Sequence, residues 1–201
     1  MSGVALIDYG AGNLRSVENA LKAAGASDIA VTADPAMIMS AHRIVLPGVG
    51  AFAHCMGALS AIPGMIDALT ESVIERGRPF LGICVGMQLM ADEGHEHGVT
   101  RGLGWIGGHV AALTSVPGLK IPHMGWNDVV PVQPHLLIEP GEAYFLHGYA
   151  FVGNDVLATT DHGGSVVAAI GRDNLAGVQF HPEKSQGYGI ATLNRFLKWR
   201  P

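Results

Sequence analysis

Short apolar segments alternate with amphipathic ones in the first half of the chain. The apolar segments cover residues 4–9, 29–33, 43–48 and 78–83. Short apolar runs bounded by turn residues are typical of strands buried on both faces. Residues 13–26 and 65–77 instead space their apolar side chains as a helix does and end at or near a glycine. The alternation predicts an α/β fold with a mostly parallel sheet flanked by helices, because parallel strands need long connections.

After residue 103 the pattern changes to β-rich segments separated by short breaks. These segments lie at 103–114, 143–152, 155–161, 165–170 and 175–180. Short connections suit antiparallel neighbours, so we expect antiparallel strands to extend the sheet in the second half. Residues 189–200 return to a helical pattern. No repeat or low-complexity linker divides the sequence, which predicts one domain over residues 1–201.

Composition narrows the kind of partner. The 201 residues carry a net charge of −5, with 14% charged residues and no basic patch suited to a phosphate backbone. No apolar run reaches the length of a membrane span, and the first residues lack a basic segment followed by an apolar one. We therefore expect a cytoplasmic protein that binds neither nucleic acid nor membrane. Two cysteines do not make a disulfide framework, so each thiol needs its own explanation.

Cys84 stands between two glycines in GICVG, where a predicted strand meets a predicted helix. Glycines two residues before and two after the central residue are the pattern of the nucleophile elbow, a strained turn that exposes its central side chain. Unpaired N–H groups at a helix start favour a thiolate. The pattern indicates a cysteine nucleophile. The alternative is a buried, unreactive cysteine, and this is our interpretation of Cys55.

His181 is the histidine best placed to act as the base that a cysteine nucleophile needs. It ends an apolar strand, and Glu183 follows two residues later, with Pro182 restricting the backbone of His181 to extended geometry. Alternate residues of an extended chain project to the same side, so Glu183 can orient one ring nitrogen while the other faces the thiol. The alternative is an ordinary histidine at a strand end beside a solvated glutamate.

The segments LPGVG, GICVGMQLM and GVQFHPE, in this order, resemble those of the class I glutamine amidotransferases. The resemblance implies that a Cys84–His181–Glu183 triad hydrolyses the side-chain amide of L-glutamine through a thioester, giving glutamate and ammonia, with no cofactor and no metal. It also implies a set of residues that bind the substrate or stabilise its oxyanion: Val49, Gly50, Val85, Gln88, His147, Gly148 and Tyr149. A small hydroxyl residue would be expected at position 148, so the glycine there removes any hydroxyl contact.

Two further segments, IDYGAGNLRSV and PHMGWN, resemble the glutaminase subunits of imidazole glycerol phosphate synthases, which act in histidine biosynthesis. In that family the glutaminase docks on a (β/α)8 cyclase subunit, which uses the ammonia to make imidazole glycerol phosphate and AICAR. The residues that we expect at this interface are Asn13, Met124, Trp126, Asn127 and Lys184.

Other interpretations stay open at the level of sequence. The chain could feed ammonia to another synthase, such as one making pyridoxal phosphate or anthranilate. It could also be a noncatalytic binding subunit of the same fold, or a cysteine peptidase. The turn at Gly10 and Gly12 resembles a dinucleotide site, but Arg15 occupies the third glycine position. The acidic and histidine-rich residues 93–97 are interpreted as a solvated loop, and Trp126 could instead be a core residue.

Overall fold

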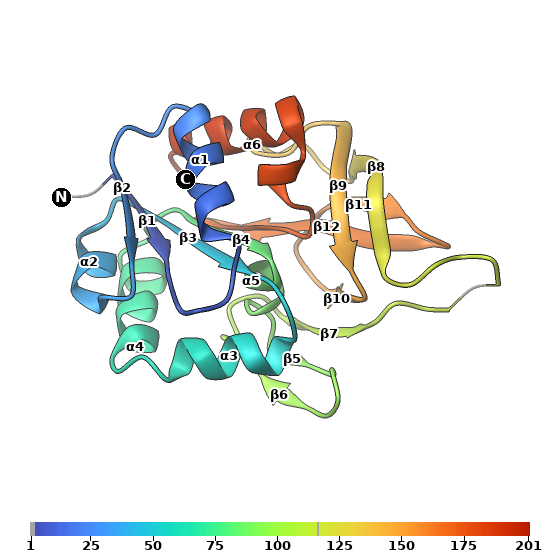
Figure 1. The fold of residues 1–201 in the computed structure, drawn as a ribbon, viewed down its shortest axis with the longest axis horizontal. Coiled ribbons are helices and arrows are strands. Elements are labelled where there is room, and N and C mark those ends of the chain that lie inside the picture. The colour runs from blue at the N-terminus through green and yellow to red at the C-terminus, as the bar shows by residue number, and fades with distance from the viewer. Residues whose placement is uncertain (1–2, 116) are drawn as a thin grey trace.

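The computed structural model describes residues 3–115 and 117–201, so residues 1, 2 and 116 of the predicted domain lie outside the described part. Most of the chain is organised around a nine-stranded sheet (Figure 1). In spatial order the sheet consists of β2 (Ile29–Thr32), β1 (Val4–Ile7), β3 (Arg43–Gly48), β4 (Phe80–Cys84), β13 (Leu175–Val178), β12 (Ser165–Arg172), β11 (Val156–Asp161), β8 (His123–Pro131) and β9 (Gly141–His147).

The nine-stranded sheet is parallel in one half and antiparallel in the other. Neighbours from β2 to β13 pair in parallel, and neighbours from β13 to β9 pair antiparallel. A smaller sheet has the order β10 (Tyr149–Gly153), β7 (Gly108–Ala112), β5 (Glu93–Gly94) and β6 (Thr100–Arg101). The predicted α/β class, with antiparallel strands added in the second half, is therefore confirmed.

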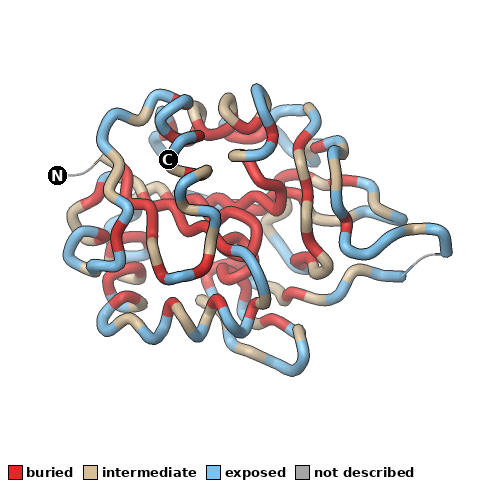
Figure 2. Tube along the Cα trace, in the orientation of Figure 1, coloured by how far each residue is buried: buried red, intermediate tan, exposed pale blue. Residues whose placement is uncertain are grey.

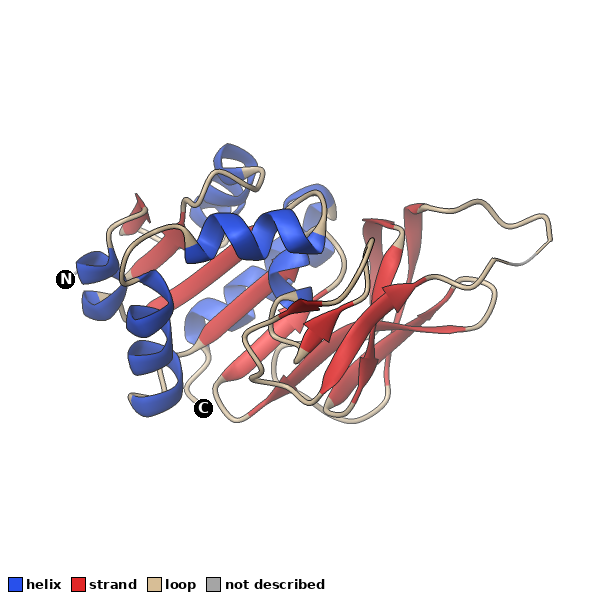
Figure 3. Cartoon of the chain, turned by 90° about the horizontal axis from the view of Figure 1, so that it is seen from below, coloured by secondary structure: helices blue, strands red, loops and turns tan. Residues whose placement is uncertain are grey.

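Helices cover both faces of the parallel half, as Figures 1 and 3 show. The helical segments are α1 (Leu14–Ala23), α2 (Pro35–Ser40), α3 (Phe52–Ser60), α4 (Met65–Leu69), a π-helical segment η1 (Thr70–Glu75), α5 (Val85–Gln88), a 3-10 turn η2 (Pro182–Lys184) and α6 (Gln186–Lys198). Helices α1 and α6 pack together on one face, and α3 and α4 lie on the other. The helix predicted over 65–77 is present but divides into α4 and η1.

The core follows the parallel strands, where the buried trace is concentrated in Figure 2. Every residue of β1, β4 and β13 is buried, which agrees with their uniformly apolar sequences. Phe80, at the start of β4, packs edge-on against Trp105 with ring centroids 5.0 Å apart. Burying a side chain of this kind stabilises the fold by roughly 1.5–3 kcal/mol.

Strand β8 has no counterpart among the predicted segments, and its side chains explain why. Its inward positions include the polar His123, which is buried, and Asn127, which is half-buried. Its outward positions include Met124 and Trp126, which are 67% and 48% exposed. The usual alternation of apolar side chains inward and polar ones outward is thus reversed at this end of the strand. Trp126 is not a core residue.

Among the described residues, no single helix has both the length and the apolar character needed to cross a membrane. The bent pair formed by Phe52–Ser60 and Met65–Glu75 would satisfy the length and composition criteria only when its two helices, at 96° to each other, are taken together.

The parallel pairing brings the chemically interesting segments to one edge of the sheet. Gly48, the last residue of β3, is the register partner of Cys84, the last residue of β4. Strand β13 pairs with β4 on its other side, and the chain continues from β13 to His181. The carboxyl ends of three neighbouring parallel strands therefore meet where ligands commonly bind in α/β sheets.

Candidate active site

Cys84 occupies the strained turn that the glycine pattern predicts. Its backbone has φ 54° and ψ −114°, a conformation that side-chain-bearing residues rarely adopt. A Cβ atom on Gly82 would lie 2.5 Å from the carbonyl oxygen of Gly86, and one on Gly86 would lie 1.9 Å from that of Leu46. Both glycines are required because backbone passes where a side chain would collide. Strain of this kind costs about 1–3 kcal/mol and persists only where the surrounding fold enforces it.

His181 lies between the cysteine and a carboxylate. Its Nδ1 is 2.9 Å from Oε1 of Glu183, and these side chains are 3% and 1% exposed. Burial lowers the pKa of His181, but hydrogen bonds to Cys84 and Glu183, together with their negative charges, raise it to about 10. The balance keeps a proton on the imidazole beside the sulfur. The predicted triad is therefore assembled in space.

The contact between His181 and Glu183 arises differently from the way the sequence suggested. His181 itself is extended, with φ −99° and ψ 99°, as Pro182 requires. The next residues form the 3-10 turn η2 rather than a continued extended chain. This turn directs the carboxylate of Glu183 back to the imidazole. The predicted pair is correct, but its geometry is that of a turn.

The loop after β3 is held by two side chains from other elements. The hydroxyl of Tyr9 donates to the carbonyl of Pro47 at 2.7 Å, and the thiol of Cys55 donates to the carbonyl of Val49 at 3.4 Å. Burial raises the pKa of Cys55, which keeps its thiol protonated and able to donate. A trans peptide points its carbonyl and its N–H in opposite directions, so the N–H of Gly50 points away from Cys55.

A cavity of about 290 Å³ opens beside Cys84. All of the residues predicted to bind substrate or stabilise its oxyanion line it, together with His181, Glu96 and Lys184. Its volume is at the lower end of the range for small-molecule sites. A larger groove of about 730 Å³ lies along Asp128–His135 and Ile138–Glu142 and contains no triad residue. The smaller cavity is the candidate active site because it contains the nucleophile and the base.

Gln88 lines the cavity, but its amide nitrogen is already committed. Nε2 of Gln88 donates to the carbonyl of Tyr149 at 3.0 Å and to Oε1 of Gln179 at 3.0 Å. The side-chain oxygen of Gln88 takes part in neither bond and can act only as an acceptor. Position 148 is open, since a Cβ atom on Gly148 would meet only a methyl group of Ile121, at 4.0 Å.

Glu96 lines the cavity although no sequence pattern marks it as a substrate-binding residue. It belongs to the polar segment 93–97, yet its Oε2 accepts the backbone N–H of Phe52, the first residue of α3, at 2.8 Å. Two other residues of the segment do not share this position: His95 pairs with Glu93 at 2.7 Å on the surface. The solvated-loop interpretation holds for this pair and is wrong for Glu96. A single acid in a polar loop carries no sequence signal of this role.

His147 lines the cavity, but both nitrogens of its ring are bound within the protein. Its Nε2 is 3.1 Å from Nδ1 of His123, and its Nδ1 is 2.9 Å from the carbonyl oxygen of Tyr149. Nε2 of His123 is in turn 3.1 Å from Nδ2 of Asn127. The same nitrogen of Asn127 donates to the carbonyl of Asp161 at 2.7 Å. Asn127, predicted at an interface, therefore has its amide nitrogen bound inside the protein.

The remaining residues predicted at the interface are exposed. Met124 and Trp126 project from β8, and Trp126 meets Tyr144 edge-on with ring centroids 6.2 Å apart. The ammonium of Lys184 lies 5.6 Å from the centre of the Tyr144 ring. Asn13 precedes α1, which packs against the η2 turn that carries Lys184. These exposed residues form a surface next to the cavity, which Lys184 also lines.

The cysteine elbow, its histidine and carboxylate partners, and the mixed sheet define a class of protein. A family model described as glutamine amidotransferase class-I matches residues 5–198. The chain belongs to the class I glutamine amidotransferase family. More particularly, it is 62% identical to imidazole glycerol phosphate synthase subunit HisH of Zymomonas mobilis, over 100% of this chain and 97% of that protein.

Two further relatives carry the same name. The chain is 53% identical to the subunit HisH of Rhodospirillum rubrum, over 98% of this chain and 99% of that protein. It is also 53% identical to the subunit of Caulobacter vibrioides, over the full length of both. A solved glutamine amidotransferase has a TM-score of 0.75 and 19% identity, over 98% of each chain, and at that identity it supports the fold alone.

Proposed function

We propose that this chain is the glutaminase subunit of an imidazole glycerol phosphate synthase, supplying ammonia to a cyclase subunit in histidine biosynthesis. The observation that carries the proposal is the buried pair of His181 and Glu183 at a small cavity that His181 and Cys84 both line. Relatives with this printed name, at 50–62% identity, support the choice of synthase over one making pyridoxal phosphate or anthranilate.

The proposed reaction begins when the thiolate of Cys84 attacks the side-chain amide carbon of glutamine. The tetrahedral oxyanion is stabilised by backbone N–H groups of Val85 and of the loop containing Val49 and Gly50. His181 protonates the departing ammonia and then activates the water that hydrolyses the thioester, while Glu183 orients and stabilises the imidazolium. Glutamate then leaves the cavity.

The cavity also offers a place for the charged end of the substrate. Glu96 supplies a carboxylate there, and Gln88 supplies an amide oxygen whose nitrogen is bound elsewhere. An ammonium group has three N–H donors and no acceptor, so both oxygens suit the α-ammonium of glutamine. The carboxylate of Glu96 also holds the first turn of α3, which places substrate binding next to the loop that carries the proposed oxyanion donors.

The proposed partner is a (β/α)8 cyclase that docks over the exposed surface beside the cavity. Met124 and Trp126 are large apolar side chains that face solvent there, and Lys184 and Asn13 lie on adjacent elements. Trp is among the residues that most often dominate interface energetics. We also propose a cytoplasmic location, because Cys55 and Cys84 are both free thiols and the reaction needs Cys84 reduced.

The test compares this chain alone with its complex with a candidate cyclase carrying its phosphoribosyl ligand. We expect slow hydrolysis of glutamine by the isolated chain, and a kcat higher by orders of magnitude in the complex with a smaller change in KM. Cys84→Ala should abolish glutamine-dependent synthesis, while added ammonium salt still supports synthesis on the cyclase. Glutamine-dependent activity that survives Cys84→Ala would refute the triad, and equal rates with and without the cyclase would refute the partner.

A further inference from the structure

Gln179 is a fully buried amide in contact with the reactive sulfur. Its side chain is 0% exposed, and it lies between the end of β13 and His181. The backbone N–H of Gln179 is bonded to the carbonyl of Ala168 at 2.9 Å, which fixes the residue against β12. Its Nε2 lies 3.6 Å from Sγ of Cys84, within hydrogen-bonding range for sulfur. The amide therefore meets the sulfur from the β13 side.

The hydrogen-bond partners of Gln88 determine which end of the Gln179 amide faces the sulfur. The amide group of Gln88 is 3.0 Å from the carbonyl oxygen of Tyr149, which can only accept, so the nitrogen of Gln88 must face it. The same nitrogen is 3.0 Å from Gln179 and can only donate. The atom of Gln179 that faces Gln88 must therefore be its oxygen. This leaves the NH₂ group of Gln179 pointing at Cys84.

We propose that Gln179 is a further catalytic residue, whose side-chain amide donates a hydrogen bond to the sulfur of Cys84 when that sulfur is a thiolate. The inference rests on the proposed glutaminase function. Hydrogen bonds from a neutral amide to an anion are stronger than those to a neutral acceptor, and more so in a site that excludes water. A thiol gains little from the same donor, because its sulfur is only a weak acceptor.

The donor acts at two points of the reaction. When His181 holds the proton of Cys84, the electron pair left on sulfur accepts the N–H of Gln179 until that pair forms the C–S bond. The negative charge then moves to the substrate oxygen and the contact weakens. When water has added to the thioester, the C–S bond breaks, its electron pair returns to sulfur, and the Gln179 amide stabilises the departing thiolate. Gln179 is unchanged throughout.

A purely structural role would also explain the buried amide, since Gln179 accepts a hydrogen bond from Gln88, which lines the substrate cavity. The variant Gln179→Glu separates the two roles. An ionised glutamate keeps the oxygen that accepts from Gln88 and loses the N–H that faces sulfur. Gln179→Leu removes both groups. A structural role predicts that the uncharged variant Gln179→Leu mainly raises KM and retains kcat. Because an ionised glutamate also repels the thiolate, a fall in kcat supports the donor only where Gln179→Leu shows it too.

The experiment measures glutaminase kinetics of both variants in the complex with the ligand-loaded cyclase, at alkaline pH where the introduced carboxyl is ionised. We expect kcat to fall about 10- to 100-fold in both variants, as for loss of one donor to a buried anion, with KM within about threefold for Gln179→Glu. The ultraviolet absorbance of the thiolate, taken as the difference from the matched Cys84→Ala protein, should fall as well. Ammonium-dependent synthesis by the same complexes checks that each variant folds and docks.

One result would overturn the role of Gln179, and a different result would overturn the proposed function. Gln179→Glu with a kcat within about twofold of the parent protein and an unchanged thiolate absorbance would overturn the inference and leave Gln179 as a support for Gln88. If Gln179→Leu does not fold, Gln179→Glu and the similarly sized Gln179→Met carry the comparison. Failure of the proposed function would look different, because Cys84→Ala would then retain glutamine-dependent activity whatever stands at position 179.

Discussion

Nδ1 of His123 donates to Nε2 of His147 across 3.1 Å, and one arrangement of protons alone satisfies both rings. The carbonyl of Tyr149 can only accept, so Nδ1 of His147 carries a proton and Nε2 is bare. Nδ1 of His123 must then be the donor, and its bare Nε2 accepts from Asn127. Both imidazoles are neutral. Each group in the chain donates to the next, from the amide of Asn127 through His123 and His147 to the carbonyl of Tyr149, which lines the cavity.

This pair makes stability depend on pH. Burial, followed by the charges of His147 and His162, lowers the pKa of His123 to about 4. Burial is also the main cause that lowers the pKa of His147 to about 4. Unfolded histidines titrate near 6.5, so between these values the unfolded chain binds more protons. The contribution of this pair to the free energy of unfolding should therefore be fully present above about pH 6.5 and be lost as the pH drops toward 4.

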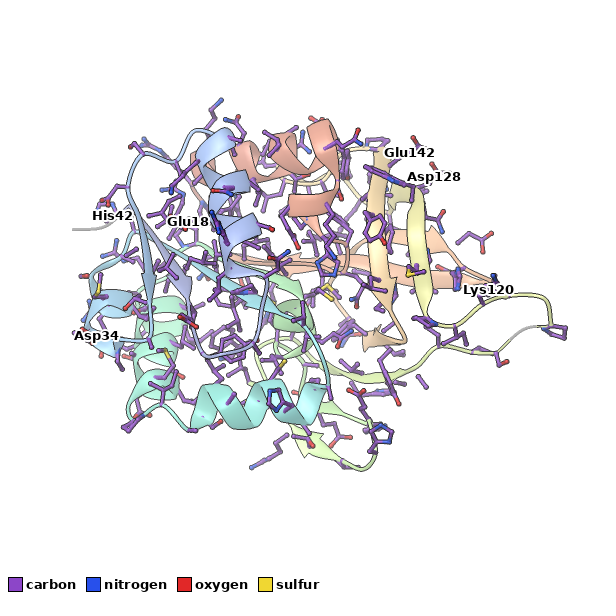
Figure 4. The ribbon with its side chains drawn as sticks, viewed as in Figure 1. Glu18, Asp34, His42, Lys120, Asp128 and Glu142 are labelled. Atoms are coloured by element: carbon purple, nitrogen blue, oxygen red, sulfur yellow. The ribbon has the colours of Figure 1, made fainter. Side chains whose placement is uncertain are left out.

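Denaturant unfolding at a series of pH values tests this prediction. His123→Asn should flatten the slope between pH 6.5 and 4, since one of the two neutral histidines is gone. His42→Asn is the control, because His42 is exposed at the opposite end of the molecule (Figure 4). An equal flattening in both variants would contradict the assignment to the buried pair.

Gly148 should tolerate a hydroxyl residue. A Cβ atom at this position has only a methyl group of Ile121 near it, at 4.0 Å, and the backbone is not in the left-handed region. Gly148→Ser should therefore fold with a stability within about 0.5 kcal/mol of the parent. If the hydroxyl reaches glutamine, the KM for glutamine falls with little change in kcat. Gly148→Ala is the matched control, and an equal KM in the two variants would show that the hydroxyl makes no contact.

Tyr9→Phe should impair catalysis as well as stability. The change removes the buried hydrogen bond from Tyr9 to the carbonyl of Pro47, which costs about 0.5–1.5 kcal/mol. Because Pro47 lies near the end of β3, just before the loop that carries the proposed oxyanion donors, kcat should fall more than KM changes. Tyr188→Phe is a matched control, since its hydroxyl also donates to a carbonyl, that of Glu139, at 2.7 Å, and neither residue lines the cavity. Glutaminase kinetics that respond alike in both variants would rule out a specific role for Tyr9.

Trp126→Ala should weaken binding to the cyclase at least tenfold while changing the free energy of unfolding little, because the side chain is already 48% exposed. Leu136→Ala is the control. Leu136 is apolar and 73% exposed, but it is not one of the residues proposed to dock on the cyclase, which are Asn13, Met124, Trp126 and Lys184. Titration of the labelled cyclase gives both affinities. Comparable losses in the two variants would move the docking surface away from β8.

The parts of the fold that the sequence predicts are those in which local pattern and tertiary environment agree. Strands β1 and β4 are apolar along their whole length because both faces are covered, and GICVG carries its glycines within five residues of chain. Strand β8 escaped prediction because its polar side chains point inward. His123 is accommodated there because His147, 24 residues away, accepts a hydrogen bond from its ring.

The residues of the candidate site likewise fall into those that local sequence marks and those that it does not. Cys84, His181 and Glu183 are marked by neighbours in sequence. Gln179 and Tyr9 are not, since their partners lie 95 and 38 residues away. A buried amide or tyrosine has no sequence pattern that distinguishes a contact with sulfur or with a loop carbonyl from ordinary packing. Such residues become visible only when the strands are paired.

The anchored carbonyls of Pro47 and Val49 restrict how the loop between them can rearrange. Turning the Gly48–Val49 peptide over leaves both anchors in place, but it would carry Val49 from its negative φ to a positive one, which a β-branched side chain resists. Turning the Val49–Gly50 peptide is easy for Gly50 but breaks the bond from Cys55. A penalty of about 1–3 kcal/mol keeps the turned loop a minor population of the free chain, one that a docked partner could make the major one.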